Sequence, residues 1–124
     1  MTTWNPDHLN TFADADELGI ASTRPDGTLR PYVTIWGVRV GDDFYVRSAH
    51  GGGNPWYRRA LASGTGSVRT GSVEVAVTFE QASPTVQKAV DAEYARKYAR
   101  YASIVGSVVG ENLYDVTLRI VPQG

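Results

Sequence analysis

The sequence contains no cysteine and only two histidines, His8 and His50. Disulfide bonds, thiolate catalysis and cysteine-ligated zinc are therefore excluded, and so is a histidine-rich metal site. No cluster of aspartate and glutamate has the spacing of metal ligands, and no apolar run is long enough to span a bilayer. The first residues lack a basic segment followed by an apolar one, so we predict no signal peptide. We expect a cytoplasmic protein that binds no metal and does not contact a membrane.

An excess of either charge is also missing. The chain has 12 basic and 13 acidic residues, a formal net charge of −1 and an isoelectric point near 6.1. Binding to nucleic acid favours a strongly basic surface, so we predict no nucleic-acid partner. Hydrophobic residues make up 42% of the 124 residues, which is enough to form an ordinary core. We therefore predict a single domain that spans residues 1–124.

Turn residues divide the chain into short elements. The patterns predict strands at 17–24, 29–40, 44–49, 66–70, 72–81 and 113–121, and helices at 6–15, 55–63 and 84–101. Tight turns at 25–28 and 41–43 are expected to join the first three strands into an antiparallel meander. The prediction is an α+β protein, mainly β, with a small six-stranded antiparallel barrel and two to three helices.

The segment after the third predicted strand has the features of a ligand site. Three glycines at 51–53 allow the backbone to approach a ligand closely. Asn54 suits the N-cap of the next helix, and Pro55 suits its first position. Because a helix N-terminus offers free N–H groups, it can hold a phosphate or a carboxylate. A plain surface loop is the alternative interpretation.

Arginines near this loop add positive charge. Arg47 is expected to pair with a ligand phosphate, or alternatively with a carboxylate on a neighbouring strand. Successive helical residues point about 100° apart, so at most one of Arg58 and Arg59 is expected to face the site. Trp56 could stack on a planar ligand or close the mouth of the barrel. His50, beside the glycines, is a further candidate for proton transfer.

One face of the last predicted helix carries Tyr94, Lys97, Tyr98 and Tyr101. Burial would lower the pKa of Lys97, which would make it an acid–base group or an anion partner. The tyrosine hydroxyls could donate hydrogen bonds to a substrate. The alternative is a lysine that lies over an aromatic surface and is stabilised by cation–π contacts.

The order of elements, with a glycine-rich loop after the third strand, resembles the FMN-binding split β-barrel superfamily. That superfamily includes pyridoxamine-phosphate-oxidase-like proteins and deazaflavin-dependent nitroreductases. The closer similarity is to the bacterial DUF2255 family. The segments that carry it are Trp4, 24–27, 35–40, 44–48, 56–59 and 92–98. The Trp-Tyr-Arg-Arg and Tyr-x-x-Lys-Tyr pieces among them are the most specific.

The resemblance implies a split-barrel homodimer with two equivalent sites at the subunit interface, each binding FMN or a deazaflavin coenzyme. It places the cofactor phosphate at Arg47, Ser48, Gly52, Gly53, Asn54 and Arg58. The ring system is expected along the second strand, near Tyr32, Thr34 and Trp36, with Trp56 beside it. Two features depart from the relatives: the loop lacks one spacer residue, and the lysine of FMN oxidases is missing from the third strand.

The function that the resemblance implies is a flavin- or deazaflavin-dependent oxidoreductase that reduces a small planar organic molecule. Lys97, Tyr98 and Tyr94 are the expected catalytic residues, contacting the substrate from the helix. One alternative is a cofactor-free cyclase or isomerase in which these residues and Asp91 supply acid–base chemistry. A second alternative is a protein that binds a small ligand without catalysis.

Overall fold

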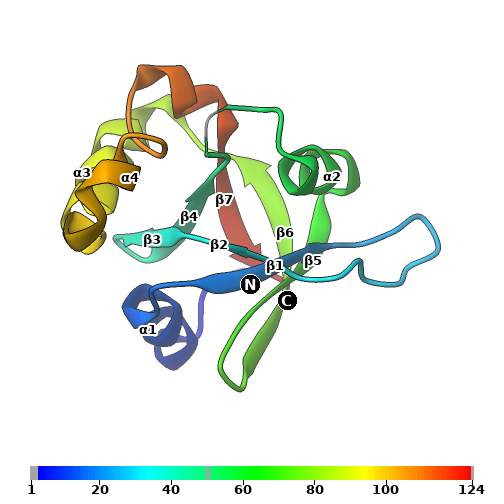
Figure 1. Ribbon diagram of the computed structural model, residues 1–124. Helices are drawn as coiled ribbons and strands as arrows, with labels where there is room; N and C mark the ends of the chain where they lie inside the picture. The colour runs from blue at the N-terminus through cyan, green and yellow to red at the C-terminus, as the bar shows by residue number, and fades with distance from the viewer. Residues whose placement is uncertain (1–2, 50, 124) are drawn as a thin grey trace.

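The computed structural model describes residues 3–49 and 51–123 and shows a curled antiparallel sheet with helices around it (Figure 1). The strands are β1 (Leu18–Ser22), β2 (Val33–Ile35), β3 (Gly37–Val40), β4 (Asp43–Arg47), β5 (Thr65–Thr70), β6 (Val73–Gln81) and β7 (Thr117–Pro122). The α-helices are α1 (Pro6–Asp14), α2 (Pro55–Ser63), α3 (Gln87–Lys97) and α4 (Ala102–Val105). Short 3-10 helices are η1 (Pro84–Val86), η2 (Ala99–Tyr101) and η3 (Glu111–Val116). The predicted α+β class is therefore confirmed.

The sheet has seven strands in the described part of the chain, not the predicted six. Its strand order is β2-β1-β5-β6-β7-β4-β3, so the two edge strands, β2 and β3, are separated in the chain only by Trp36. The predicted strand at 29–40 is thus broken: β2 pairs with β1, and β3 pairs with β4. Both antiparallel pairings of the predicted meander are present, but they are made by the two separate halves of its middle strand, and β5, β6 and β7 connect β1 to β4 around the rest of the curled sheet.

Two contacts mark the break at Trp36, where pairing changes from β1 to β4. The carbonyl of Trp36 accepts a hydrogen bond from the Tyr94 hydroxyl at 3.1 Å. A side chain at Gly37 would come within 2.5 Å of the Phe44 ring, so the glycine leaves room for that ring in the core. The chain can therefore pass from one edge of the curled sheet to the other at this point.

The helices lie close to the predicted positions, and two of the predicted elements, one helix and one strand, differ from the structure. Helix α2 has the predicted bounds, and in α1 the Asn5 carboxamide caps the N–H groups of Asp7 and His8. The predicted helix at 84–101 is divided into η1, α3 and η2. The predicted strand at 113–121 begins only at Thr117, because the preceding residues form η3, in which the Leu113 N–H bonds to the Gly110 carbonyl.

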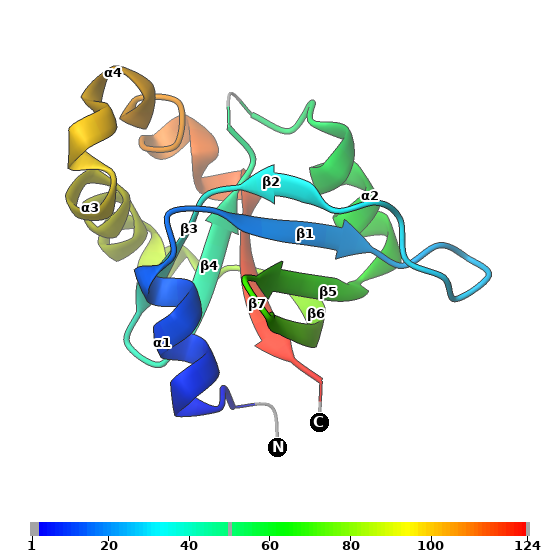
Figure 2. The same cartoon turned by 60° about the horizontal axis from the view of Figure 1, so that its bottom comes forward.

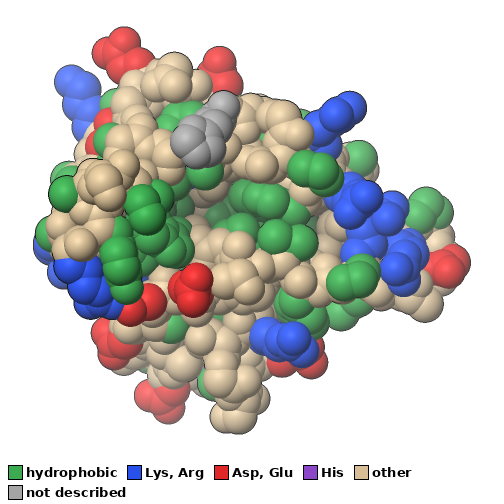
Figure 3. Space-filling model, in the orientation of Figure 1, with side chains coloured by type: hydrophobic (Ala, Val, Ile, Leu, Met, Phe, Trp, Pro, Cys, Tyr) green, Lys and Arg blue, Asp and Glu red, His purple; other side chains and the backbone are tan. Residues whose placement is uncertain are grey.

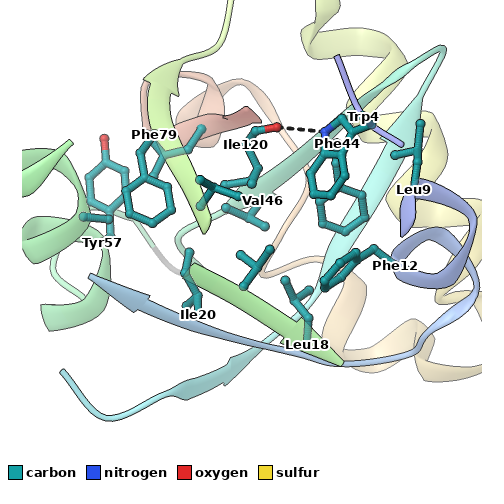
Figure 4. Packing of buried hydrophobic residues seen from close by; sticks show 14 residues of the cluster. Trp4, Leu9, Phe12, Leu18, Ile20, Phe44, Val46, Tyr57, Phe79 and Ile120 are labelled. Carbon is teal, nitrogen blue, oxygen red and sulfur yellow. Dashed lines mark hydrogen bonds between the residues drawn. The ribbon is translucent and has the colours of Figure 1, made fainter. Parts of the chain in front are cut away.

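Two apolar clusters hold the elements together. The larger lies inside the curled sheet and is closed by α1 and α2; Figure 4 shows Phe12, Phe44 and Trp4 packed against one another. The Trp4 indole N–H donates to the Ile120 carbonyl at 3.0 Å, which fixes the N-terminal segment to β7. The smaller cluster lies between α3 and strands β3 and β4. Figure 2 shows α1 beside β3 and β4, and α2 at the other end of the sheet near β1 and β5.

Candidate functional site

An apolar cavity of about 400 Å³ opens where the two edge strands meet. It lies between β2, the loop after β4, the start of α2 and the segment that follows α4, and Figure 3 shows hydrophobic side chains gathered in a hollow on this face. Its lining residues are Val33, Thr34, Ile35, Trp36, Arg47, Ala49, Asn54, Trp56, Ile104, Ser107 and Val108. Five of the predicted cofactor-binding residues are among them: Thr34, Trp36, Arg47, Asn54 and Trp56.

Two tryptophans form walls of this cavity. The Trp36 ring stacks on Tyr98 with centroids 4.0 Å apart and an interplanar angle of 4°. Trp56 meets Tyr57 edge to face at 6.0 Å. Each tryptophan is therefore held by a buried aromatic neighbour and remains half-buried itself. Fixed indole rings of this kind offer flat surfaces on which a planar ligand can stack.

Arg47 lies at the base of the cavity, but its guanidinium is fully engaged by the protein. The Nε–H donates to Thr117 Oγ1 at 2.9 Å, and Nη2 donates to the Gln87 carbonyl at 3.1 Å and to its Oε1 at 2.9 Å. Nη1 donates to the Val108 carbonyl at 2.9 Å and to an Asp91 carboxylate oxygen. The guanidinium has five N–H groups, and these five bonds use them all. The predicted phosphate contact would have to replace one of them.

Asp91 is the carboxylate partner of this buried arginine. Burial would raise the pKa of Asp91, but hydrogen bonds from the Tyr114 hydroxyl, Arg47 and the Gly110 N–H outweigh it, and the net pKa lies below the ordinary value. The Tyr114 bond measures 2.7 Å and the Gly110 bond 3.0 Å. The ion pair thus ties β4, α3 and the segment before β7 into one buried network.

Ser48 and Asn54 brace the glycine-rich loop. The Asn54 amide donates to Ser48 Oγ at 2.9 Å and to the Ala49 carbonyl at 2.7 Å, and Ser48 Oγ donates to the Gly51 carbonyl. Asn54 is the N-cap residue of α2, as predicted, but its side chain does not cap the helix. A Cβ would meet nothing within 4 Å at Gly53, and only ordinary contacts at Gly52. His50 lies outside the described residues.

Lys97, Tyr94 and Tyr98 lie between α3 and the sheet and do not line the apolar cavity. Lys97 Nζ donates to the Gly37 carbonyl at 2.7 Å, and burial lowers the pKa of Lys97 to about 8. The Tyr98 hydroxyl donates to the Asp16 carbonyl at 2.7 Å, and burial raises the pKa of Tyr98 to about 12. Burial also raises the pKa of Tyr94, whose hydroxyl accepts a hydrogen bond from the backbone N–H of Arg47 at 3.1 Å.

The cation–π interpretation of Lys97 agrees with this geometry. Its Nζ lies 5.2 Å from the centroid of the Tyr98 ring and 5.9 Å from that of Phe44. The lysine therefore packs over aromatic rings while its ammonium bonds to backbone carbonyls.

A second hollow, of about 730 Å³, adjoins α2 and the loop between β1 and β2. We call it the arginine cleft, because Arg24, Arg30, Arg58 and Arg59 all line it. Arg58 and Arg59 both line this cleft, which runs alongside α2, and neither lines the apolar cavity. Sequence reasoning also missed Arg24 and Arg30, whose loop contacts α2 only in the folded chain.

Within residues 3–49 and 51–123, no group of three or more histidine, aspartate or glutamate side chains is arranged to hold a metal ion. None of the helices in this part of the chain has the length and hydrophobicity needed to cross a bilayer.

Residues 8–120 match the model of a family described as "Uncharacterized protein conserved in bacteria (DUF2255)". The chain belongs to the DUF2255 family. Because the match spans nearly the whole chain, the family assignment rests on more than the short motifs that first indicated it. None of the curated proteins compared with this DUF2255 protein matches its sequence.

Solved structures of split-barrel proteins share the fold of this DUF2255 protein. An F420-H2-dependent reductase is 20% identical, with a TM-score of 0.62 over 86% of this chain and 93% of the other. An FAD-binding protein from Mesorhizobium loti is 16% identical, with a TM-score of 0.58 over 98% and 92%. The heme-storage protein of Vibrio cholerae is 10% identical, with a TM-score of 0.67 over 100% and 92%. At these identities the likeness establishes the fold alone.

Proposed function

We propose that this DUF2255 protein binds a flavin or deazaflavin coenzyme and reduces a small planar organic molecule. The observation that carries the proposal is the apolar cavity with two fixed indole walls. Its volume of about 400 Å³ lies within the usual range for small-molecule sites, roughly 300–1,000 Å³. The shared fold with an F420-H2-dependent reductase and an FAD-binding protein supports it.

The residues present fit the ring part of such a cofactor. Trp36 and Trp56 offer flat apolar surfaces, and Thr34 adds a hydroxyl at the same wall. When bound, the cofactor supplies the hydride chemistry; the protein binds and orients the ring and keeps water from it. In this proposal Arg58, which lies in the neighbouring cleft, holds the cofactor phosphate, because all five guanidinium N–H groups of Arg47 already donate within the protein.

The predicted catalytic residues receive a different role in this proposal. Tyr98 is stacked directly behind Trp36, and Tyr94 bonds to the carbonyl of the same tryptophan. Together with Lys97 they position the Trp36 wall instead of contacting the substrate. The cofactor-free acid–base alternative has less support, since these polar atoms bond to the backbone and lie outside the cavity.

Binding of the cofactor can be tested by thermal unfolding of the purified protein with FMN, FAD, the deazaflavin coenzyme or heme, alongside its visible spectrum. We expect one of the first three to raise the melting temperature, because a ligand at about 100 times its Kd adds about 2.7 kcal/mol of stability. Trp56→Ala should weaken that binding by about fivefold, since it removes a stacking surface worth about 1 kcal/mol.

Leu61→Ala is the matched control, because Leu61 lies on the same helix, is 47% exposed and does not line the cavity. It should leave the affinity unchanged. A colourless protein whose melting temperature is unchanged by all three coenzymes would contradict the redox proposal. A rise in melting temperature with heme alone would favour a ligand-binding protein.

We also propose that this face forms the interface of a homodimer. Val33 is 39% exposed and Ile104 is 51% exposed, and the two lie on the rim of the apolar cavity. Exposed apolar side chains around one hollow favour contact with another protein surface. Sedimentation velocity should give the mass of two chains for the wild type and of one chain for Ile104→Glu. A wild-type protein that sediments as a monomer would contradict the proposed homodimer.

A further inference from the structure

The arginine cleft gathers four arginines, of which only Arg24 has a described electrostatic interaction with a carboxylate, that of Asp26 in the same loop. Arg24 and Arg30 come from the loop between β1 and β2, while Arg58 and Arg59 come from α2. No described ion pair involves any of these four side chains. Figure 3 shows the corresponding group of basic side chains at one side of the apolar hollow.

The arginines elsewhere in the described chain are mostly paired. Arg39, Arg47, Arg96, Arg100 and Arg119 each have a carboxylate partner. In a chain with a net charge of −1 there are enough carboxylates to pair more of them. The four unpaired guanidinium groups around one cleft repel one another, and a bound anion would relieve that repulsion.

The lining of the cleft adds groups that hydrogen-bond to anions. Thr23 and Thr65 line it together with the arginines, whereas the Ser63 hydroxyl, also in the lining, donates to the Thr65 carbonyl at 3.1 Å. The Arg24 guanidinium is steadied by hydrogen bonds from Nη1 to the Leu29 carbonyl at 3.0 Å and to Thr28 Oγ1 at 3.3 Å. A side chain held in this way loses little freedom when it binds a ligand.

The cleft also lies beside the apolar cavity. A small hollow between them is lined by Arg30 and Arg59, which belong to the cleft, and by Val33 and Trp56, which belong to the cavity. A single molecule could therefore place a ring against Trp56 and its anionic group among the arginines.

We propose that the arginine cleft binds a small ligand with at least two negative charges, such as a phosphate monoester or a diphosphate. A guanidinium group binds phosphate oxygens through a pair of parallel hydrogen bonds. Four guanidinium groups supply more positive charge than an anion with a single negative charge would balance. The ligand is the charged tail of a molecule whose ring occupies the cavity, or a separate phosphorylated compound. The site does not depend on the identity of that ring.

Calorimetric titration with inorganic pyrophosphate at fixed ionic strength tests the cleft directly. We expect binding to the wild type and a loss of about tenfold in affinity for each of Arg30→Gln and Arg59→Gln. Arg59 is exposed and Arg30 is half-buried, and neither is in the core, so these variants should fold. Arg69→Gln is the control: Arg69 is exposed and in no described ion pair, but lies over the Tyr32 ring outside the cleft.

No pyrophosphate binding, or equal binding by the Arg30→Gln/Arg59→Gln double variant, would overturn the proposal. A second titration with the FMN or deazaflavin complex distinguishes the two sources of charge. Competition with pyrophosphate identifies the cofactor tail as the occupant, and simultaneous binding identifies a separate phosphorylated compound. Riboflavin, which has the ring without the phosphate, reports on the apolar cavity independently of the cleft.

Discussion

Replacing Arg47 by methionine is expected to lower the free energy of unfolding by about 3 kcal/mol, the lower end of the cost of breaking a buried ion pair. The substitution removes five hydrogen bonds and leaves Asp91, Gln87 and Thr117 without their common donor. For a chain of this size the melting temperature should fall by roughly 10 °C. Chemical denaturation and calorimetry measure both quantities.

Arg96→Met is the matched control, because Arg96 pairs with Glu93 on the exposed surface of α3. Its effect should stay within about 0.5 kcal/mol. An Arg47→Met protein of normal stability that has lost affinity for a phosphorylated cofactor would contradict the structural role and restore the predicted phosphate contact.

Acid unfolding gives a further readout of the same network. The pKa of Asp91 is lowered in the folded protein, so its interactions stabilise the fold fully above its ordinary pKa of 3.8. That contribution is lost as the pH falls through the lower folded value. In Arg47→Met the pKa should rise, and the dependence of stability on pH below about 4 should become weaker.

Gly66→Ala is expected to destabilise the protein by about 3 kcal/mol, the upper end of the usual cost of overpacking. A Cβ at this position would lie 2.0 Å from the Ala21 carbonyl oxygen and 2.9 Å from the Phe79 ring. The backbone atom cannot move unless β5 separates from β1, where Gly66 is paired with Ser22. Urea unfolding and amide hydrogen exchange in β1 would show the loss.

Gly106→Ala serves as the comparison, because an added Cβ there meets nothing within 4 Å and its φ of −56° suits any residue. It should leave stability unchanged or raise it by about 0.5 kcal/mol. If the two alanine variants unfolded at the same denaturant concentration, close strand contact would not be the reason for glycine at position 66.

Elements that depend on neighbouring residues could be predicted well. Helix α2 begins at Pro55 and ends at Ser63 as predicted, because Asn54 and Pro55 mark its start and Gly64 directly follows its last residue. The strand at 29–40 was predicted less well. Its apolar alternation continues through Trp36, and only pairing with β1 on one side and β4 on the other divides it.

The candidate site also combines features that could be predicted with features that depend on tertiary contacts. The resemblance to the split-barrel superfamily placed Thr34, Trp36, Asn54 and Trp56 at one site, and the four residues do line one cavity. The sequence did not predict which arginines have a carboxylate partner. Arg47 is paired with Asp91, 44 residues away, and Arg58 remains unpaired beside arginines from another loop.

The sequence by itself determined which chemistries are absent, where most helices and strands begin and end, and which family the motifs indicate. Those properties follow from composition and from residues within a few positions of one another. Only the tertiary structure decided which edge strands meet at Trp36, which arginine is neutralised and which arginines share a cleft. Each of these depends on contacts between segments distant in the chain, and such contacts form only when the sheet curls and α3 and α2 pack against it.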